Sequence, residues 1–283
     1  MDKNTFIKMY GEYLRDESRQ VGNAESIVFP KSEYEIISSV KEMSRKNIQI
    51  TTQGARTGLA ASAVPYGGHI INLSKMNKVI GARYDESGDR FFITVQPGVL
   101  LSELRKYTAN KSFNTDGWDE KSINALKHME KNQWFYSTDP TETSASMGGM
   151  ASCNASGAKS YRYGSAREHI NGLRVVLADG DVLDIKRGRH IAGEDGKFHL
   201  VTEGGRRIEG KLPNYKMPDV KKNTSGYYNK PKMDMIDLFI GSDGTLGIIS
   251  EIEIELNKTQ KSNWGITIFM PDEDKSVDLV RAI

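Results

Sequence analysis

Three clusters of glycine and other small residues are the part of the sequence whose residue types and spacing could do chemistry. The first, residues 53–59, reads Gln-Gly-Ala-Arg-Thr-Gly-Leu and directly follows a short alternating segment typical of a strand. Small residues in such a loop let consecutive backbone N–H groups converge on an anion such as a phosphate. An ordinary turn has a similar composition, so both interpretations stay open for this cluster alone.

The second cluster is the longest, because fourteen of the eighteen residues 141–158 are Gly, Ala, Ser, Thr or Cys. Ser144 is predicted to cap a short helix that turns Met147 and Met150 inward and leaves its first amides free for a phosphate. Gly148-Gly149 would allow a flat ligand to approach the backbone closely. A small-residue helix packed on a sheet, or a flexible linker, would have the same composition.

The third cluster, residues 241–247, reads Gly-Ser-Asp-Gly-Thr-Leu-Gly and immediately precedes the clearest strand pattern in the chain, residues 248–256. We expect it to feed that strand from a tight turn, although glycine before a strand is also common in ordinary loops. The sequence has neither the G-x-G-x-x-G nor the G-x-x-x-x-G-K-[ST] spacing. Rossmann and P-loop nucleotide sites are therefore not supported.

Composition narrows the class of protein. The 283 residues carry 39 Lys+Arg and 37 Asp+Glu, a net charge of +2, which gives no broad attraction to nucleic acid. No run approaches the roughly 18 apolar residues of a membrane span, and residues 1–16 carry acids where a signal peptide is apolar, so a cytoplasmic location is expected. The single Cys153 excludes an intrachain disulfide, and the five histidines lack ligand spacing, so no metal site is expected.

The segments around the clusters predict an α+β fold with short strands. Apolar residues at helical spacing predict a helix over residues 6–14 and a second one that opens at Ser32, with Glu35 completing a capping box. A further helix is predicted over 99–107, and strands over 47–51, 69–73, 90–96, 169–177, 182–185 and 248–256. Residues 186–232 are expected to form a long surface connection. After a polar link, a strand over 264–270 and a helix over 272–283 are predicted to begin a new unit.

In this order and spacing the three clusters resemble the FAD-linked oxidase family, the flavoproteins of the vanillyl-alcohol oxidase type. The resemblance runs from about residue 28 to residue 256 and is nearest to the 2-hydroxy-acid branch, which includes D-lactate dehydrogenases and the flavin subunit of glycolate oxidase. Further motifs that carry it are Val95-Gln-Pro-Gly98, Asp139-Pro140, Arg162-Tyr-Gly164 and Gly226-Tyr227.

The resemblance implies an α+β FAD-binding domain of two α/β subdomains over residues 1–256, followed by the beginning of a substrate or cap domain over residues 257–283. It places the FAD pyrophosphate on the backbone amides of the first loop, whose residues are Gln53, Gly54, Ala55, Arg56, Thr57, Gly58 and Leu59. The flavin and ribityl neighbours that it implies are Pro140, Ser146, Gly148, Gly149, Asn154, Gly157 and, on the closing strand, Ile249. Some relatives attach the flavin through a histidine in the first loop; this loop has none, so FAD is expected to be non-covalent.

The function that the resemblance implies is oxidation of a small 2-hydroxy acid such as D-lactate or glycolate by hydride transfer to the flavin. In the family, the base and the cation that orient the acid lie largely in the substrate domain, so no catalytic residue is assigned, and His69 and His169 are expected to be structural. The alternatives are an enzyme of the UDP-N-acetylenolpyruvoylglucosamine reductase type and a flavin-binding or electron-relay subunit with no substrate site of its own. Apolar residues between 264 and 280 predict self-association or a partner subunit at this end.

Overall fold

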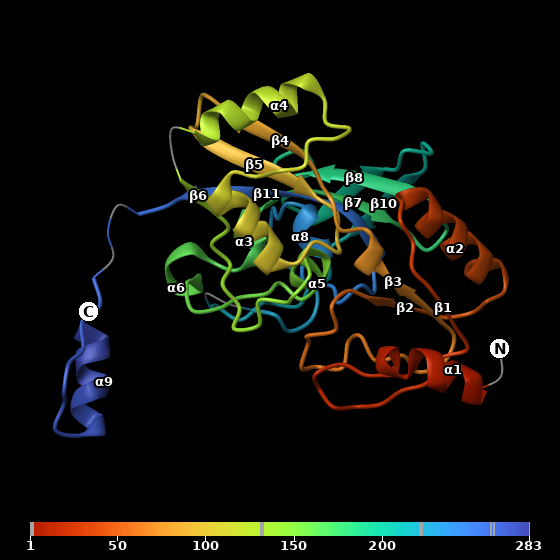
Figure 1. Cartoon of the computed structure of the whole chain (residues 1–283), viewed down its shortest axis with the longest axis horizontal. Coiled ribbons are helices and arrows are strands. Elements are labelled where there is room, and N and C mark those ends of the chain that lie inside the picture. Colours follow the sequence, from red (N-terminus) through yellow and green to blue (C-terminus); the bar gives the residue numbers. More distant parts are fainter. Residues whose placement is uncertain (1–2, 131–132, 221–222, 261, 263, 283) are drawn as a thin grey trace.

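The structure is a computed structural model that describes residues 3–130, 133–220, 223–260, 262 and 264–282. Helices and strands alternate irregularly along the chain, as expected for an α+β fold. The described strands form a parallel sheet in the order β1-β3-β2, a larger sheet in the order β4-β5-β11-β7-β8 with β6 also paired to β11, and a β9–β10 hairpin. Figure 1 shows the small sheet and α1 below the large sheet, with α2 at the right beside both.

The first subdomain is built around the small sheet. Its elements are α1 (Lys3–Tyr10), a 3-10 turn (Gly11–Leu14), β1 (Ser26–Val28), α2 (Glu33–Arg45), β2 (Ile50–Gln53) and β3 (His69–Asn72). Helix α2 begins where it was predicted, and the Ser32 hydroxyl accepts a hydrogen bond from the Glu35 N–H at 3.3 Å. The predicted capping box does not close, because the Glu35 carboxylate accepts from the Lys31 N–H instead.

The second subdomain is built around β11 (Ile248–Lys258), which lies between β5 (Arg90–Val95) and β7 (Ile170–Val176) and is antiparallel to both. The other strands of this sheet are β4 (Val79–Asp85), β6 (Trp134–Phe135) and β8 (Val182–Lys186). The predicted strand is confirmed, and Ile252 and Ile254 are fully buried. Glu253 on its other face is also buried, because Arg83 pairs with its carboxylate at 3.1 Å.

Short helices cover this sheet and carry the second small-residue cluster. They are α3 (Leu101–Asn110), α4 (Glu120–Leu126), a 3-10 turn (Lys127–Met129), α5 (Met147–Ser152), α6 (Ser160–Tyr163), α7 (Ala166–His169) and α8 (Ile236–Phe239). Met147 and Met150 are buried in the core, as predicted. The helix expected over residues 99–107 is confirmed as α3.

A charged network docks the two subdomains. Arg174 on β7 holds the Glu33 carboxylate of α2 at 2.8 Å and the Glu203 carboxylate at 2.6 Å. The Ser250 hydroxyl donates to Glu33 at 2.5 Å. Arg174 and Ser250 together lower the pKa of the Glu33 carboxyl below its usual value, although its partial burial acts against them. The apolar faces of α2, β3 and β11 pack together beside this network.

Two predictions about the last part of the chain are wrong. Residues 186–232, expected to be a surface connection, contain the antiparallel strands β9 (Lys197–Val201) and β10 (Arg207–Lys211). Residues 264–270, expected to be a strand, form no strand, and no described neighbour pairs with them. The helix predicted after them is present as α9 (Glu273–Ala282), which stands apart from the two sheets at the left of Figure 1. No described helix has the length and apolar character needed to cross a membrane.

Two buried histidines predict how stability depends on pH. Burial lowers the pKa of both His69 and His169 below the usual value of about 6.5. Below that pH these two histidines bind protons in the unfolded chain but remain largely unprotonated in the folded chain. The free energy of unfolding should therefore be steady just above pH 6.5 and fall below it, by up to ~1.4 kcal/mol per pH unit for each histidine.

Urea unfolding followed between pH 7.5 and 5.5 measures this effect. His69→Gln and His169→Gln should flatten the profile, whereas Tyr34→Leu, at an exposed position of α2, serves as the control. A wild-type profile that stays level down to pH 5.5 would contradict the prediction.

Candidate functional site

The three small-residue clusters meet around one cavity of about 220 Å³. Its wall is formed by the loop after β2, by α5 and the residues flanking it, and by the turn that leads into β11. The predicted site residues that line it are Gly54, Ala55, Arg56, Thr57, Gly58, Pro140, Ser146, Gly148, Gly149 and Ile249. Segments far apart in the sequence are therefore brought together at this cavity.

Four predicted site residues lie outside this wall. Gln53 is buried behind the first loop, where its amide donates to the backbone of Tyr13 and Ala63. Leu59 points to solvent. Gly157 packs against the Asp139 carbonyl, so closely that a Cβ atom at this position would lie 1.5 Å from the oxygen. Asn154 is buried and is bound within the protein.

Ser146 joins the first cluster to the second. Its hydroxyl oxygen accepts hydrogen bonds from the Ala55 N–H at 3.2 Å and from the Gly149 N–H at 3.4 Å. Gly54 lies so close that a Cβ atom there would be 2.1 Å from this hydroxyl. Ser146, and not Ser144 as predicted, is the residue that caps α5.

The N-terminus of α5 is not open to a ligand, which corrects the expectation that its first amides are free. The Met147 N–H donates to the Val99 carbonyl and the Gly148 N–H donates to the Pro97 carbonyl, both at 2.8 Å. The Gly149 N–H is directed to Ser146. The sequence could not show this, because Pro97 and Val99 belong to a distant turn that only the fold brings to the helix.

The first loop supplies the free amides instead. In the part of the chain that the structure describes, the backbone N–H groups of Arg56, Thr57 and Gly58 have no acceptor within the protein. Arg56 adopts the left-handed conformation, with φ of +61°. Successive N–H groups on either side of a left-handed residue form a concavity that binds anions. This part of the wall is therefore suited to a phosphate.

The third cluster is fastened to the end of α5. The Gly241 N–H donates to the Ala151 carbonyl at 3.0 Å, and the Asp243 N–H donates to the Ser152 carbonyl at 2.9 Å. Gly247 has a φ of +156°, and a Cβ atom there would lie 2.5 Å from a methyl carbon of Val175. The chain can pass from this turn into β11 only because the residue at 247 has no side chain.

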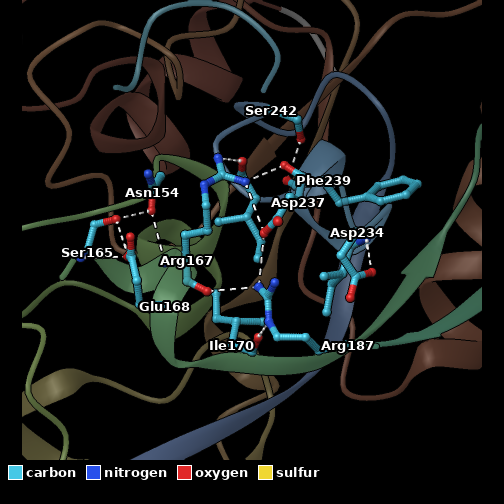
Figure 2. Close-up of polar contacts among 12 residues, drawn as sticks. Asn154, Ser165, Arg167, Glu168, Ile170, Arg187, Asp234, Asp237, Phe239 and Ser242 are labelled. Carbon is cyan, nitrogen blue, oxygen red and sulfur yellow. Dashed lines mark hydrogen bonds and ion pairs between the residues drawn. The ribbon is translucent and has the colours of Figure 1, made fainter. Parts of the chain in front are cut away.

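A buried network around Arg167 holds the second and third clusters together, and sequence reasoning did not find it (Figure 2). The Arg167 guanidinium donates to the Asp237 carbonyl at 2.5 Å and to the Ile240 carbonyl at 2.6 Å. Its charge is balanced by the Asp237 carboxylate, which Arg187 also contacts at 3.0 Å. Burial lowers the pKa of this guanidinium, an effect that Asp237 opposes.

Asn154 connects this network to α5. Its side-chain oxygen accepts hydrogen bonds from the Ser165 hydroxyl at 2.9 Å and from the Arg167 N–H at 3.0 Å. Its backbone is left-handed, with φ of +46°, a conformation that asparagine tolerates better than most residues. In this structure the amide that was predicted to face the flavin shapes the loop behind the cavity wall.

The titratable side chains in the wall are few. They are Arg56, Glu142, Cys153 and Asp243. Desolvation by the surrounding protein and the nearby Asp243 carboxylate raise the pKa of the Cys153 thiol to about 12, so it stays protonated at neutral pH. No histidine lines the described cavity: His69 is held by Ser26 and Ser39, and His169 by Ser137. Within the described residues no group of His, Cys, Asp or Glu could hold a metal ion.

Comparison with known proteins identifies the class. The FAD binding domain family matches residues 24–116 and 121–186, more than half of the chain, so the chain belongs to this family and FAD is its cofactor. Among solved structures, alkyldihydroxyacetonephosphate synthase matches with a TM-score of 0.53 and 18% identity over 83% of this chain and 34% of its own length. At that identity the likeness supports the fold alone, and it agrees with an oxidase-type FAD-binding domain.

Several curated relatives are named as 2-hydroxy-acid dehydrogenases. The chain is 30% identical to the D-lactate dehydrogenase of Anaerostipes hadrus over 266 residues, which is 93% of this chain and 42% of that protein. It is 26% identical to the D-2-hydroxyglutarate dehydrogenase of Stutzerimonas stutzeri (strain A1501) over 273 residues, 95% of this chain and 46% of that protein. The chain thus spans less than half the length of these relatives.

The cavity fits FAD in two respects. The unpaired amides of residues 56–58 suit a pyrophosphate, which carries the only strong negative charges of this cofactor. The apolar side chains of Pro97, Pro140 and Ile249 suit a flat aromatic ring. Since ligand sites usually enclose about 300–1,000 Å³, the enclosed part of this cavity would cover only part of the cofactor.

The bridging role of Ser146 gives a direct test of how the wall is assembled. Ser146→Ala removes the cap of α5 and leaves the Ala55 N–H without its acceptor, which should lower the free energy of unfolding by about 1–2 kcal/mol. Urea denaturation measures the change. Ser144→Ala is the matched control, because Ser144 is exposed and its side chain caps nothing; equal stability of the two variants would refute this assignment.

Proposed function

We propose that this chain is the FAD-binding portion of a flavin-dependent oxidoreductase that oxidises a small 2-hydroxy acid such as D-lactate or glycolate. The observation that carries the proposal is the cavity where the three small-residue clusters meet, the first two of which lie within the match to the FAD binding domain family. The names of the curated relatives support the substrate class. The domain boundary at residue 256, the cytoplasmic location and self-association through residues 264–280 stay predictions.

In the proposed site the first loop holds the FAD pyrophosphate. The N–H groups of Arg56, Thr57 and Gly58 would donate to its oxygens, and Ser146 keeps this loop against α5. Pro140, Gly149 and Ile249 would lie along the flavin end, where small or apolar groups exclude water without clashing. We propose that the cofactor is bound without a covalent link, because the loop at residues 53–59 has no histidine and none lies among the described residues of the wall.

Bound flavin supplies the electron-pair acceptor for hydride transfer. The residues of this chain bind and orient it, but the cavity wall offers little for the substrate's proton. The Cys153 thiol is protonated, and the Arg56 guanidinium is engaged by Tyr13 and Glu12. The Glu142 and Asp243 carboxylates of the wall would repel the carboxylate of a 2-hydroxy acid, so we propose that the base for the hydroxyl proton and the cation for the carboxylate come from groups outside the wall. The need for a base and a cation from outside the wall also favours a second candidate function, that of a flavin-binding or electron-relay module.

FAD uptake is the first test. The purified chain should bind about one equivalent of FAD in a visible-absorbance titration and release it on acid denaturation. Gly149→Val should weaken binding at least tenfold, because a Cβ atom there would lie 3.2 Å from the Ser146 hydroxyl and, since Gly149 lines the cavity, the added methyls would enter it. Arg207→Gln on β10 is the control. A chain that ignores FAD, or flavin that stays with the denatured polypeptide, would contradict this prediction.

The single cysteine provides a readout that needs no activity. Bound FAD should protect Cys153, in the cavity wall, from a mercurial thiol reagent, whereas Cys153→Ala should still bind FAD and lose all labelling. Labelling at the same rate with and without saturating FAD would place the cofactor elsewhere.

Substrate turnover separates the two candidate functions. Because the described wall has no histidine and its one cation, Arg56, is engaged by Tyr13 and Glu12, the FAD-loaded chain should be bleached by dithionite but show little dye reduction with D-lactate, glycolate or D-2-hydroxyglutarate. Joined to a substrate domain like that of its longer relatives, it should turn over one of these acids. Rates typical of enzymes from residues 1–283 alone, lost in His169→Ala, would overturn this prediction.

A further inference from the structure

Residues 11–23, which we call the N-terminal belt, lie against both ends of the first loop and its continuation to residue 67. At the start of the loop, the buried Gln53 amide donates to the Tyr13 carbonyl at 2.8 Å and to the Ala63 carbonyl at 2.7 Å. One side chain therefore closes the loop upon itself and ties it to the belt. The match to the FAD binding domain family begins only at residue 24, after the belt.

The far end of the loop is tied to the belt as well. The Asn23 N–H donates to the Pro65 carbonyl at 2.8 Å, and the Gly67 N–H donates back to the Asn23 carbonyl at 2.7 Å. The Tyr66 hydroxyl donates to the Gln20 side chain at 2.8 Å. At Gly22 a Cβ atom would lie 1.8 Å from the Pro65 carbonyl oxygen, so the two backbones are in close contact.

Arg56, in the middle of the loop, contacts the belt through both its backbone and its side chain. Its carbonyl accepts a hydrogen bond from the Glu17 N–H at 3.2 Å. Its guanidinium lies 4.3 Å from the centre of the Tyr13 ring and 3.5 Å from the Glu12 carboxylate. These contacts hold the side chain against the belt, and Arg56 is also one of the residues that line the cavity.

These contacts with the belt offset the energetic cost of an unfavourable backbone conformation at Arg56. Arg56 has a φ of +61°, and a residue with a Cβ atom adopts the left-handed region only when its surroundings hold it there. The same conformation directs the N–H groups of residues 56–58 together as an anion-binding concavity. Without the belt, the loop would be free to relax to a conformation in which these amides diverge.

We propose that the N-terminal belt is part of the cofactor site and that Tyr13 is a positioning residue, which holds Arg56 left-handed so that the loop amides bind a diphosphate. The inference rests on the proposed function, because FAD supplies that diphosphate. The Arg56 guanidinium acts through the belt and does not meet the phosphates. It follows that the affinity for ligands with a diphosphate, FAD and ADP, depends on Tyr13. The affinity for riboflavin, which has no phosphate, does not.

The test compares FAD, ADP and riboflavin binding by titration calorimetry in the full chain. Tyr13→Leu and Arg56→Gln should each weaken FAD and ADP about tenfold and leave riboflavin affinity within twofold. Tyr13→Phe, which keeps the ring, should rescue the loss. Tyr34→Leu and Arg207→Gln are matched controls at exposed positions of α2 and β10. Thermal melting of the ligand-free variants checks that each remains folded.

A second comparison at Arg56 itself does not depend on the folding of the Tyr13 variant. Glycine adopts a φ of +61° without steric cost. Arg56→Gly should therefore bind FAD more tightly than Arg56→Gln, although both lack the guanidinium. Equal losses in these two variants would show that the guanidinium contacts the phosphates directly and would overturn the inference.

Three other results of these binding measurements would also overturn one of the two proposals. Wild-type affinity for FAD and ADP in Tyr13→Leu would overturn the positioning role. Equal weakening of all three ligands would also overturn it, because the belt would then support the whole subdomain rather than the diphosphate site. A wild-type chain that binds none of the three ligands would instead refute the proposed function.

Discussion

The buried guanidinium of Arg167 is the interaction on which the cavity depends most. An unpaired charge inside a protein costs several kcal/mol, so the chain can fold only if acceptors surround this group. The acceptors come from Asp237 and Ile240, at the end of the segment that precedes the third cluster. Because α7 and α8 must both contact this one cation, the turn at residues 241–247, which follows α8, lies at the end of α5.

The first loop is held in a different way. Neutral hydrogen bonds from Gln53 and to Ser146, together with the grip on Arg56, fasten it to the rest of the molecule. Individual neutral hydrogen bonds contribute only about 1 kcal/mol each, so this wall is less strongly determined than the one built around Arg167. Its unpaired amides would gain most from a bound anion, and binding a ligand stabilises whichever conformation it selects.

The chemistry of the wall is that of binding rather than proton transfer. Two carboxylates, a protonated thiol and an arginine turned toward Tyr13 are its titratable groups. His69 and His169 are used as buried hydrogen-bonding groups, and burial lowers the pKa of both. This distribution of titratable groups agrees with a domain that binds a cofactor, while the groups that transfer protons lie outside the cavity wall.

The sequence by itself determined the elements whose patterns repeat within a few residues. Helix α2 with its Ser32 cap, strand β11, the inward Met147 and Met150, and the small-residue loops that form the wall all follow from spacing or from the absence of side chains. Tertiary structure decided the rest, because the partners are remote: Ala55 lies 91 positions from Ser146, and the amides of α5 are taken by Pro97 and Val99. The hairpin β9–β10 has weak periodicity, and residues 264–270 have a strand-like pattern but pair with no strand among the described residues. A local pattern reports what a segment can bury, whereas the three-dimensional fold alone decides which distant donor and acceptor meet.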